Sequence, residues 1–118
     1  MIFEKTELPG AYIIELEMLK DERGWFARTF CRKEFEGHGL NQDITQCSTS
    51  LNKKKGTLRG MHYQSQPYEE AKLVRCTQGA IHDIIADLRP SSPTFKKWTA
   101  VELSEENKKM IYIPEGFA

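Results

Sequence analysis

Short apolar runs separated by turn-forming residues fill most of the chain, and this pattern is what most constrains its fold. Turn chemistry recurs at residues 21–24, 78–79 and 90–93. Helical periodicity is almost absent, and only residues 32–39 predict a short helical turn or a loop that ends on glycine. Many short strands between regular turns predict an all-β fold, either an antiparallel sandwich or a barrel. The expected strands cover residues 12–19, 25–30, 44–51, 57–64, 72–77, 79–88, 98–103 and 110–113, after an extended arm at residues 1–9.

Length and composition exclude several classes of protein. The 118 residues suit a single domain over residues 1–118, and 17 acidic residues balance 17 basic ones. Charge balance gives no reason to expect a nucleic acid or an acidic membrane as partner. No apolar run is long enough to span a bilayer and no leader opens the chain, so we expect a cytoplasmic protein. Cys31, Cys47 and Cys76 form neither an even set nor a CxxC pair, which predicts reduced thiols.

Residues 57–64, in the run GTLRGMHYQ, carry polar groups that a strand serving only the core would lack. Arg59, Gly60 and His62 fall within four positions. Arginine is costly to bury without an anion, and glycine weakens a strand unless a bulge or a close approach requires it. We therefore expect this central strand to line a pocket, with His62 as its working group. Arg59 and His62 have opposite parity, so a bulge at Gly60 is needed to turn both inward. The alternative for His62 is a hydrogen-bonded structural role.

Other candidate groups share faces with apolar neighbours or with one another. Gln46, Ser48 and Ser50 fall on one side of a strand, which suits either a cavity or a solvent-facing surface. Lys72 shares its face with Val74 and Cys76, and Asp83 shares its face with Ile81 and Ile85. A carboxylate among apolar residues needs a partner or its pKa rises, so Lys72 and Asp83 are a candidate ion pair, structural or functional. His38 and His82 are interpreted as structural.

A metal site is disfavoured. Small β-barrels that bind a metal often present a His-x-His pair on one face of a strand. Here the position two residues after His62 is Gln64, a poor ligand for zinc or iron. We expect no metal.

Several segments together resemble one known family, the dTDP-4-dehydrorhamnose 3,5-epimerases. They are DERGWF at 21–26, QxSxS at 46–50, LRGMHYQ at 58–64, KLVR at 72–75, DIIADLRPSSPTF at 83–95 and YIPEGFA at 112–118. The resemblance covers almost the whole chain. It implies an isomerase with a cupin-type antiparallel jelly roll. It also implies a homodimer in which the N-terminal strand joins the partner's sheet, and no metal or nicotinamide cofactor.

The resemblance also implies a reaction and roles for residues. The substrate is a dTDP-4-keto-6-deoxyhexose, epimerised at C3, C5 or both in rhamnose-type deoxysugar biosynthesis. Carbons beside a ketone carry acidic protons, so a base and a cation that stabilises the enolate suffice for exchange. His62 is implied as the base and Lys72 as the group near the enolate oxygen. Asp83 is our hypothesis for a replacement of the family's aspartate that orients the base, and it is not implied by the resemblance. Arg23 and Arg59 are implied to hold the diphosphate and nucleotide, and further substrate contacts fall at Arg28, Gln46 and Ser48.

Departures from the family pattern leave two functions open. The family usually has asparagine at the position of Ser48 and often glutamate at that of Arg28. It continues beyond the position of Ala118 with a tyrosine acid and an aspartate that pairs with the base. We therefore expect an incomplete jelly roll, from a fragment or a shortened gene, whose open edge is covered by dimerisation. Tyr63 or Tyr68, in either subunit, is the candidate replacement acid. The alternative function is a non-catalytic module that binds a nucleotide sugar or dimerises.

Overall fold

The fold is almost entirely β. A computed structural model describes residues 1–118 as eight strands and one helix of six residues. The elements are β1 (Ile2–Lys5), β2 (Tyr12–Glu15), β3 (Leu19–Asp21), β4 (Gly24–Phe26), α1 (Arg32–Gly37), β5 (Lys72–Arg75), β6 (Ala80–Ala86), β7 (Trp98–Ser104) and β8 (Met110–Ile113). No helix has the length and apolarity that a membrane crossing requires.

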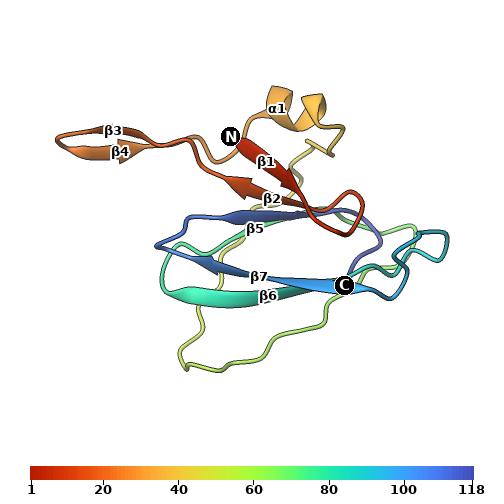
Figure 1. Ribbon diagram of the computed structural model, residues 1–118. Coiled ribbons are helices and arrows are strands. Elements are labelled where there is room, and N and C mark those ends of the chain that lie inside the picture. The colour runs from red at the N-terminus through yellow and green to blue at the C-terminus, as the bar shows by residue number, and fades with distance from the viewer.

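Two antiparallel sheets form the body of the molecule. The larger has the order β1-β2-β8-β5, and β6 pairs with β7 over seven residues below it, while α1 lies above (Figure 1). The prediction of an all-β antiparallel fold is confirmed. β1 pairs with β2 of its own chain and leaves its outer edge unpaired.

β8 is the central strand, and it is buried on both faces. Met110 and Tyr112 pack with Phe35 of α1 on one side, whereas Ile111 and Ile113 pack toward the β6–β7 pair on the other. A strand buried on both sides needs consecutive apolar residues, and the run MIYI supplies them. The members of the cluster between the sheets are Leu8, Ala11, Ile85, Leu103, Ile111, Ile113 and Phe117.

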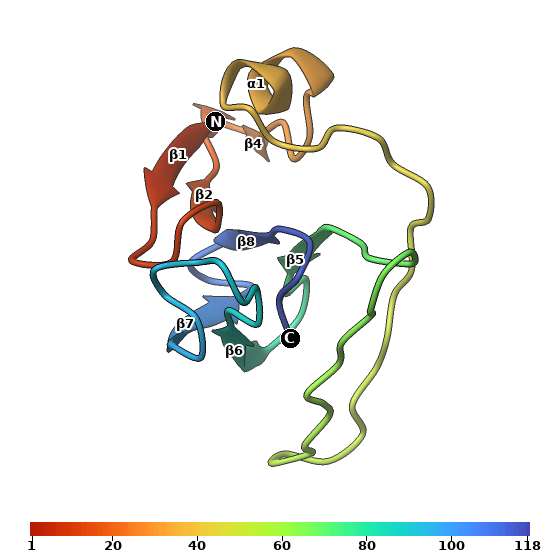
Figure 2. The same cartoon turned by 90° about the vertical axis from the view of Figure 1, so that its right-hand side faces the viewer.

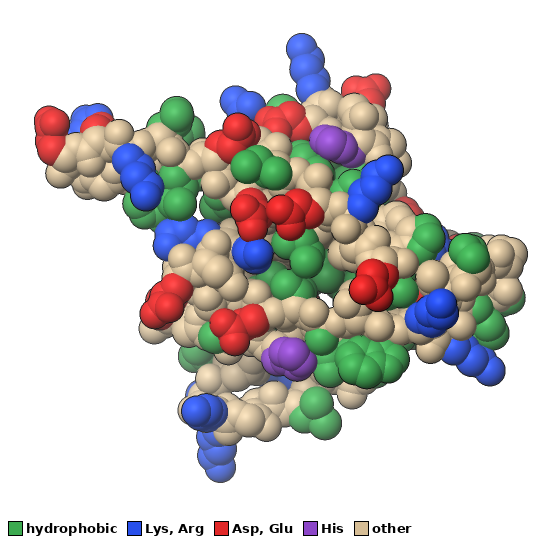
Figure 3. Space-filling model, in the orientation of Figure 1, with side chains coloured by type: hydrophobic (Ala, Val, Ile, Leu, Met, Phe, Trp, Pro, Cys, Tyr) green, Lys and Arg blue, Asp and Glu red, His purple; other side chains and the backbone are tan.

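The strand predicted at residues 12–19 is divided in two. β2 ends at Glu15, and β3 leaves the sheet to form a separate hairpin with β4. Gly24, with φ of +135°, lies directly after its tight turn. This hairpin projects from the body, and Figure 3 shows apolar side chains at its surface. Leu19, Trp25 and Phe26 are all exposed. The turn predicted at residues 21–24 is confirmed.

The strands predicted at residues 44–51 and 57–64 are wrong for this chain. Both segments are extended and exposed, and neither pairs with another strand. We call residues 44–51 the first arm and residues 57–64 the second arm. Figure 2 shows the arms running out from the body and back, joined by residues 52–56. Their sequences suit strands, but no strand of the chain lies beside them to complete a ladder.

A buried carboxylate joins the ends of the chain to the body. Asp87 is fully buried and accepts hydrogen bonds from Arg89 Nη2 (2.7 Å) and Thr94 Oγ1 (2.6 Å). Burial alone would raise the pKa of the Asp87 carboxyl, but hydrogen bonds from Arg89, Ser92 and Thr94 outweigh it. The pKa therefore lies well below its usual value. Arg89 also donates to the Pro9 carbonyl and lies over the Phe117 ring.

Candidate active site

Lys72 and Asp83 come from the two sheets and point into the space between them. Lys72 on β5 is partly buried on the face that holds Val74, and Asp83 on β6 is partly buried on the face that holds Ile85. The alternation predicted from the sequence is confirmed for both strands, because β residues of equal parity share a face. The structure thus places one cation and one carboxylate on inward faces that are otherwise apolar.

Lys72 has an ion-pair partner, whereas the carboxylate of Asp83 has none. Burial raises the pKa of the Asp83 carboxyl, while the Ile84 N–H and the positive charges of His82 and Lys72 oppose that rise only in part. Lys72 Nζ forms its ion pair with Glu70 Oε1 at 3.1 Å, not with Asp83. Sequence analysis missed Glu70, because it lies in the loop before β5, where parity carries no information.

His62 and Arg59 lie on the second arm, outside the two sheets. His62 is exposed, and its ring folds back over Gly60, with Cδ2 3.4 Å from the point that a Cβ at residue 60 would occupy. Arg59 Nε donates to Asn52 Oδ1 at 2.7 Å, which links the second arm to the turn between the arms. The expected pocket-lining strand is wrong here, and no ladder exists in which Gly60 could form a bulge.

Gln46 and Ser48 lie on the first arm. Both side chains are exposed, as is Ser50, so the chain adopts the solvent-facing alternative for this row of polar groups. The structure does not bring them against Lys72 or Asp83 by any hydrogen bond or ion pair.

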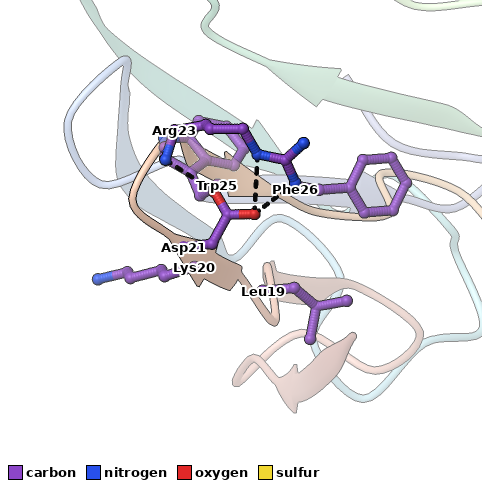
Figure 4. A pocket seen from close by; sticks show the side chains of 7 residues that line it. Leu19, Lys20, Asp21, Arg23, Trp25 and Phe26 are labelled. Carbon is purple, nitrogen blue, oxygen red and sulfur yellow. Dashed lines mark hydrogen bonds and ion pairs between the residues drawn. The ribbon is translucent and has the colours of Figure 1, made fainter.

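Arg23 lies on the projecting hairpin beside an open hollow of about 410 Å³. Its guanidinium donates to Asp21 Oδ2 (Nη2 to Oδ2, 2.6 Å), and Figure 4 shows the Phe26 and Trp25 rings lying close by. The Arg23 hydrogen bonds lower the pKa of the Asp21 carboxyl. The aromatic lining was missed because the sequence predicted only a strand over residues 25–30 and gave these two rings no role. Both are exposed, since the hairpin packs on no sheet.

Arg28 follows the hairpin closely in sequence, at its base beside α1. Arg28 Nη1 donates to Glu34 Oε1 of α1 at 3.1 Å, and this hydrogen bond raises the pKa of the Arg28 guanidinium. The predicted residues therefore fall in three places: the hairpin with Arg28, the two arms, and the space between the sheets.

Metal-ligand chemistry is sparse in the chain. No group of three or more His, Cys, Asp or Glu side chains lies close enough together to hold a metal ion. Cys31, Cys47 and Cys76 are free thiols, as the sequence predicts.

Comparison with known proteins identifies the family. Residues 5–118 match the family model of dTDP-4-dehydrorhamnose 3,5-epimerase. The dTDP-4-dehydrorhamnose 3,5-epimerase of Shigella flexneri is 49% identical over 115 residues, which are 97% of this chain and 63% of that protein.

Solved structures show the same backbone arrangement in longer chains. The dTDP-4-dehydrorhamnose 3,5-epimerase of Elizabethkingia anophelis superposes with a TM-score of 0.90 at 43% identity, over 100% of this chain and 64% of that one. An epimerase of Legionella pneumophila in complex with dTDP-4-keto-L-rhamnose gives 0.80 at 40% identity, over 99% of this chain and 62% of that one. The chain thus spans slightly less than two thirds of the length of these relatives, and its fold is their cupin-type jelly roll. The protein belongs to the dTDP-4-dehydrorhamnose 3,5-epimerase family, a family of isomerases.

Proposed function

We propose that this chain carries the base and the enolate-stabilising cation of an epimerase acting on a dTDP-4-keto-6-deoxyhexose. The observation that supports it most is the inward pair of Lys72 and Asp83, in a chain that matches the family from residue 5 to residue 118. The Legionella relative, bound to dTDP-4-keto-L-rhamnose, supports the substrate class.

The proposed reaction needs one proton removed and one returned. His62 takes the proton from C3 or C5, and the electron pair moves onto the C4 oxygen as an enolate. The ammonium of Lys72 stabilises that developing charge, because preorganised cations act most strongly where charge appears. The hydroxyl of Tyr63 or Tyr68, of this chain or of a partner subunit, then delivers a proton to the opposite face of the carbon, which inverts the centre and leaves a phenolate that is reprotonated from solvent. Asp83 takes over the role of orienting His62, in place of the aspartate that pairs with the base in the family.

The remaining predicted residues bind substrate in this proposal. Arg23 and Arg59 take the diphosphate, since guanidinium groups match phosphate oxygens in bidentate geometry. Contacts to nucleotide or sugar are assigned to Arg28, Gln46 and Ser48. Because these side chains lie in three places, substrate binding requires the arms and the hairpin to converge on the space between the sheets. A homodimer in which β1 offers its open edge to the partner is part of the proposal.

Solvent-exchange NMR tests the chemistry directly. In D₂O, the protein is expected to exchange the protons beside the ketone of a dTDP-4-keto-6-deoxyhexose. Replacing His62 with alanine lowers the rate on the order of 10²-fold or more, the usual cost of losing a general base. His82→Ala is the matched control, because His82 is exposed on the outer side of β6. Equal loss in both variants contradicts the assignment of His62.

A second function, binding without turnover, is favoured by the exposed position of His62 outside the sheets. A non-catalytic module predicts that dTDP raises the melting temperature while no deuterium enters the sugar. Exchange that depends on His62 excludes this alternative.

A further inference from the structure

Two carboxylates compete for the ammonium of Lys72. Lys72 Nζ forms an ion pair with Glu70 Oε1 at 3.1 Å. The other carboxylate belongs to Asp83 on β6. Burial raises the pKa of the Asp83 carboxyl, and the positive charge of Lys72 opposes that rise. A lysine ammonium sits on a flexible stem and can turn to either partner. The choice of partner decides where the positive charge of the candidate site lies.

Strand register places Lys72 and Asp83 opposite each other. β5 ends at Arg75, three positions after Lys72, and β6 begins at Ala80, three positions before Asp83. Residues 76–79 join the two strands, and both side chains point between the sheets. Figure 2 shows β5 above β6. Packed sheets lie about 10 Å apart, a gap that a lysine and an aspartate side chain can span together.

The backbone holds both members of the observed ion pair in place. Lys72 pairs with Ile113 of β8, which is buried. Ala71, between the two charged residues, packs against the apolar cluster on the α1 side of the sheet. The Glu70 side chain is 46% exposed and that of Lys72 is 34% exposed. Glu70 therefore approaches the ammonium from the solvent side, at the edge of the space between the sheets.

The two possible ion pairs differ in their solvation. The pair with Glu70 is open to water, so it is weak and easily exchanged. A pair between Lys72 and Asp83 would lie deeper between the sheets, where charges attract more strongly because less water screens them. If Glu70 lost its charge, the unpaired carboxylate of Asp83 would be the anion left for Lys72.

We propose that Glu70 is a positioning residue that holds the Lys72 ammonium at the edge of the sheets and apart from Asp83. The inference rests on the proposed function, in which Lys72 stabilises the enolate and Asp83 orients His62. A direct ion pair between Lys72 and Asp83 would withdraw both charges from those roles. The weak pair with Glu70 gives way instead when negative charge develops on the substrate oxygen.

Titration of the Asp83 carboxyl tests this positioning without any substrate. Carbon-13 NMR follows the carboxyl signals of the 118-residue protein against pH, and Asp83→Asn identifies the signal of Asp83. We expect Glu70→Gln to move this titration to lower pH, because the ammonium released from residue 70 favours the ionised carboxylate. Glu69→Gln is the matched control, since it removes the same charge one position away and Glu69 forms no ion pair.

A second variant separates an effect through Lys72 from a direct effect of Glu70 on Asp83. In a Lys72→Met background, Glu70→Gln is expected to leave the titration of Asp83 where Lys72→Met alone puts it. An equal shift with and without Lys72 would overturn the proposal, as would an unchanged titration in the Glu70→Gln single variant. Circular dichroism checks that each variant is folded.

Turnover is measured on the same variants in the D₂O exchange assay. Glu70→Gln is expected to lower kcat on the order of tenfold and to leave KM within about twofold, because a misplaced ammonium is missed mainly in the transition state. An unchanged kcat beside a shifted titration would refute the role of Glu70 in the reaction. A shifted titration in a protein that shows no exchange rejects the proposed function and keeps the placement of Lys72 by Glu70.

Discussion

The body and the arms of this molecule differ in strand pairing. The β-forming segments of the body are hydrogen-bonded to neighbouring strands, and those of the arms are not. β8 lies between β2 and β5, and all four of its residues are buried. The arms have comparable runs of β-forming residues, yet they are exposed along their length. The difference shows that strand propensity becomes structure only where a neighbouring strand satisfies the backbone. It also divides the candidate site, with Lys72 and Asp83 in the body and His62 on an arm.

The largest change in the free energy of unfolding is expected when the buried carboxylate of Asp87 is replaced. Asp87→Asn removes the charge that Arg89 pairs with, and we expect unfolding to become easier by about 3–5 kcal/mol in urea titrations. The folded pKa lies below the unfolded value of about 3.9, so this stabilisation is complete above that value and declines as the pH falls. The difference between the two proteins should therefore narrow below about pH 4. Asp43→Asn, at an exposed carboxylate, is the control.

A pair of truncations compares the two regions directly. Ile85 is 1% exposed in the body, and Ile85→Ala is expected to cost about 2–4 kcal/mol through lost burial and a cavity. Leu58→Ala on the arm should change the free energy of unfolding of the isolated chain by less than about 0.5 kcal/mol. Equal costs would mean that the arm is packed in solution, and the contrast between the regions would be lost.

A smaller loss of stability is expected when Gly116, at the C-terminal end of the body, gains a side chain. Its φ is +81°, and a Cβ there would lie 2.5 Å from Arg89 Cγ. Gly116→Ala should lower the free energy of unfolding by about 1–3 kcal/mol, because alanine adopts this conformation poorly and crowds Arg89. Gly37→Ala, where no atom lies within 4 Å, should have little effect. Similar losses at both positions would contradict this account.

The smallest predicted effect is a gain in stability, from the replacement of Asp83. Burial raises the folded pKa of Asp83, so its ionised form opposes folding at pH 7. Asp83→Asn should raise the melting temperature at pH 7 by roughly 2–6 °C and leave it unchanged at pH 3, where the carboxyl is neutral in both states. Glu102→Gln, on the exposed side of β7, is the control. A lower melting temperature at pH 7 would show that Lys72 pairs with Asp83 strongly enough to offset burial.

The sequence predicted much of the body because its signals are local. The run at residues 110–113 forms β8 with the predicted bounds, and the inward faces of Lys72 and Asp83 follow from strand parity. The break between β2 and β3 was not predictable in this way, since no glycine or proline marks residues 16–18.

The strand predictions at residues 44–51 and 57–64 failed because strand pairing depends on contacts between segments distant in sequence. The arms lack strand pairing because pairing is a property of two segments, and no window of sequence contains both. Asp87 was missed for a different reason. Its hydrogen-bond donors Arg89, Ser92 and Thr94 lie within seven positions, but the segment at residues 90–93 indicated only a turn and not that the turn folds its hydroxyls around a carboxylate. The roles of His62 and the arginines rest on the family resemblance and stay predictions.

The central position of β8 has a consequence for how the protein is made. β8 is the last of the eight strands in sequence, yet it separates β2 from β5 in the sheet. During synthesis, β2 therefore emerges from the ribosome long before β8, its neighbour in the sheet. Neither apolar cluster can close before residues 110–113 emerge. Closure of such distant pairings is slow. The nascent chain is thus exposed to aggregation until β8 emerges, and only then can the two apolar clusters close.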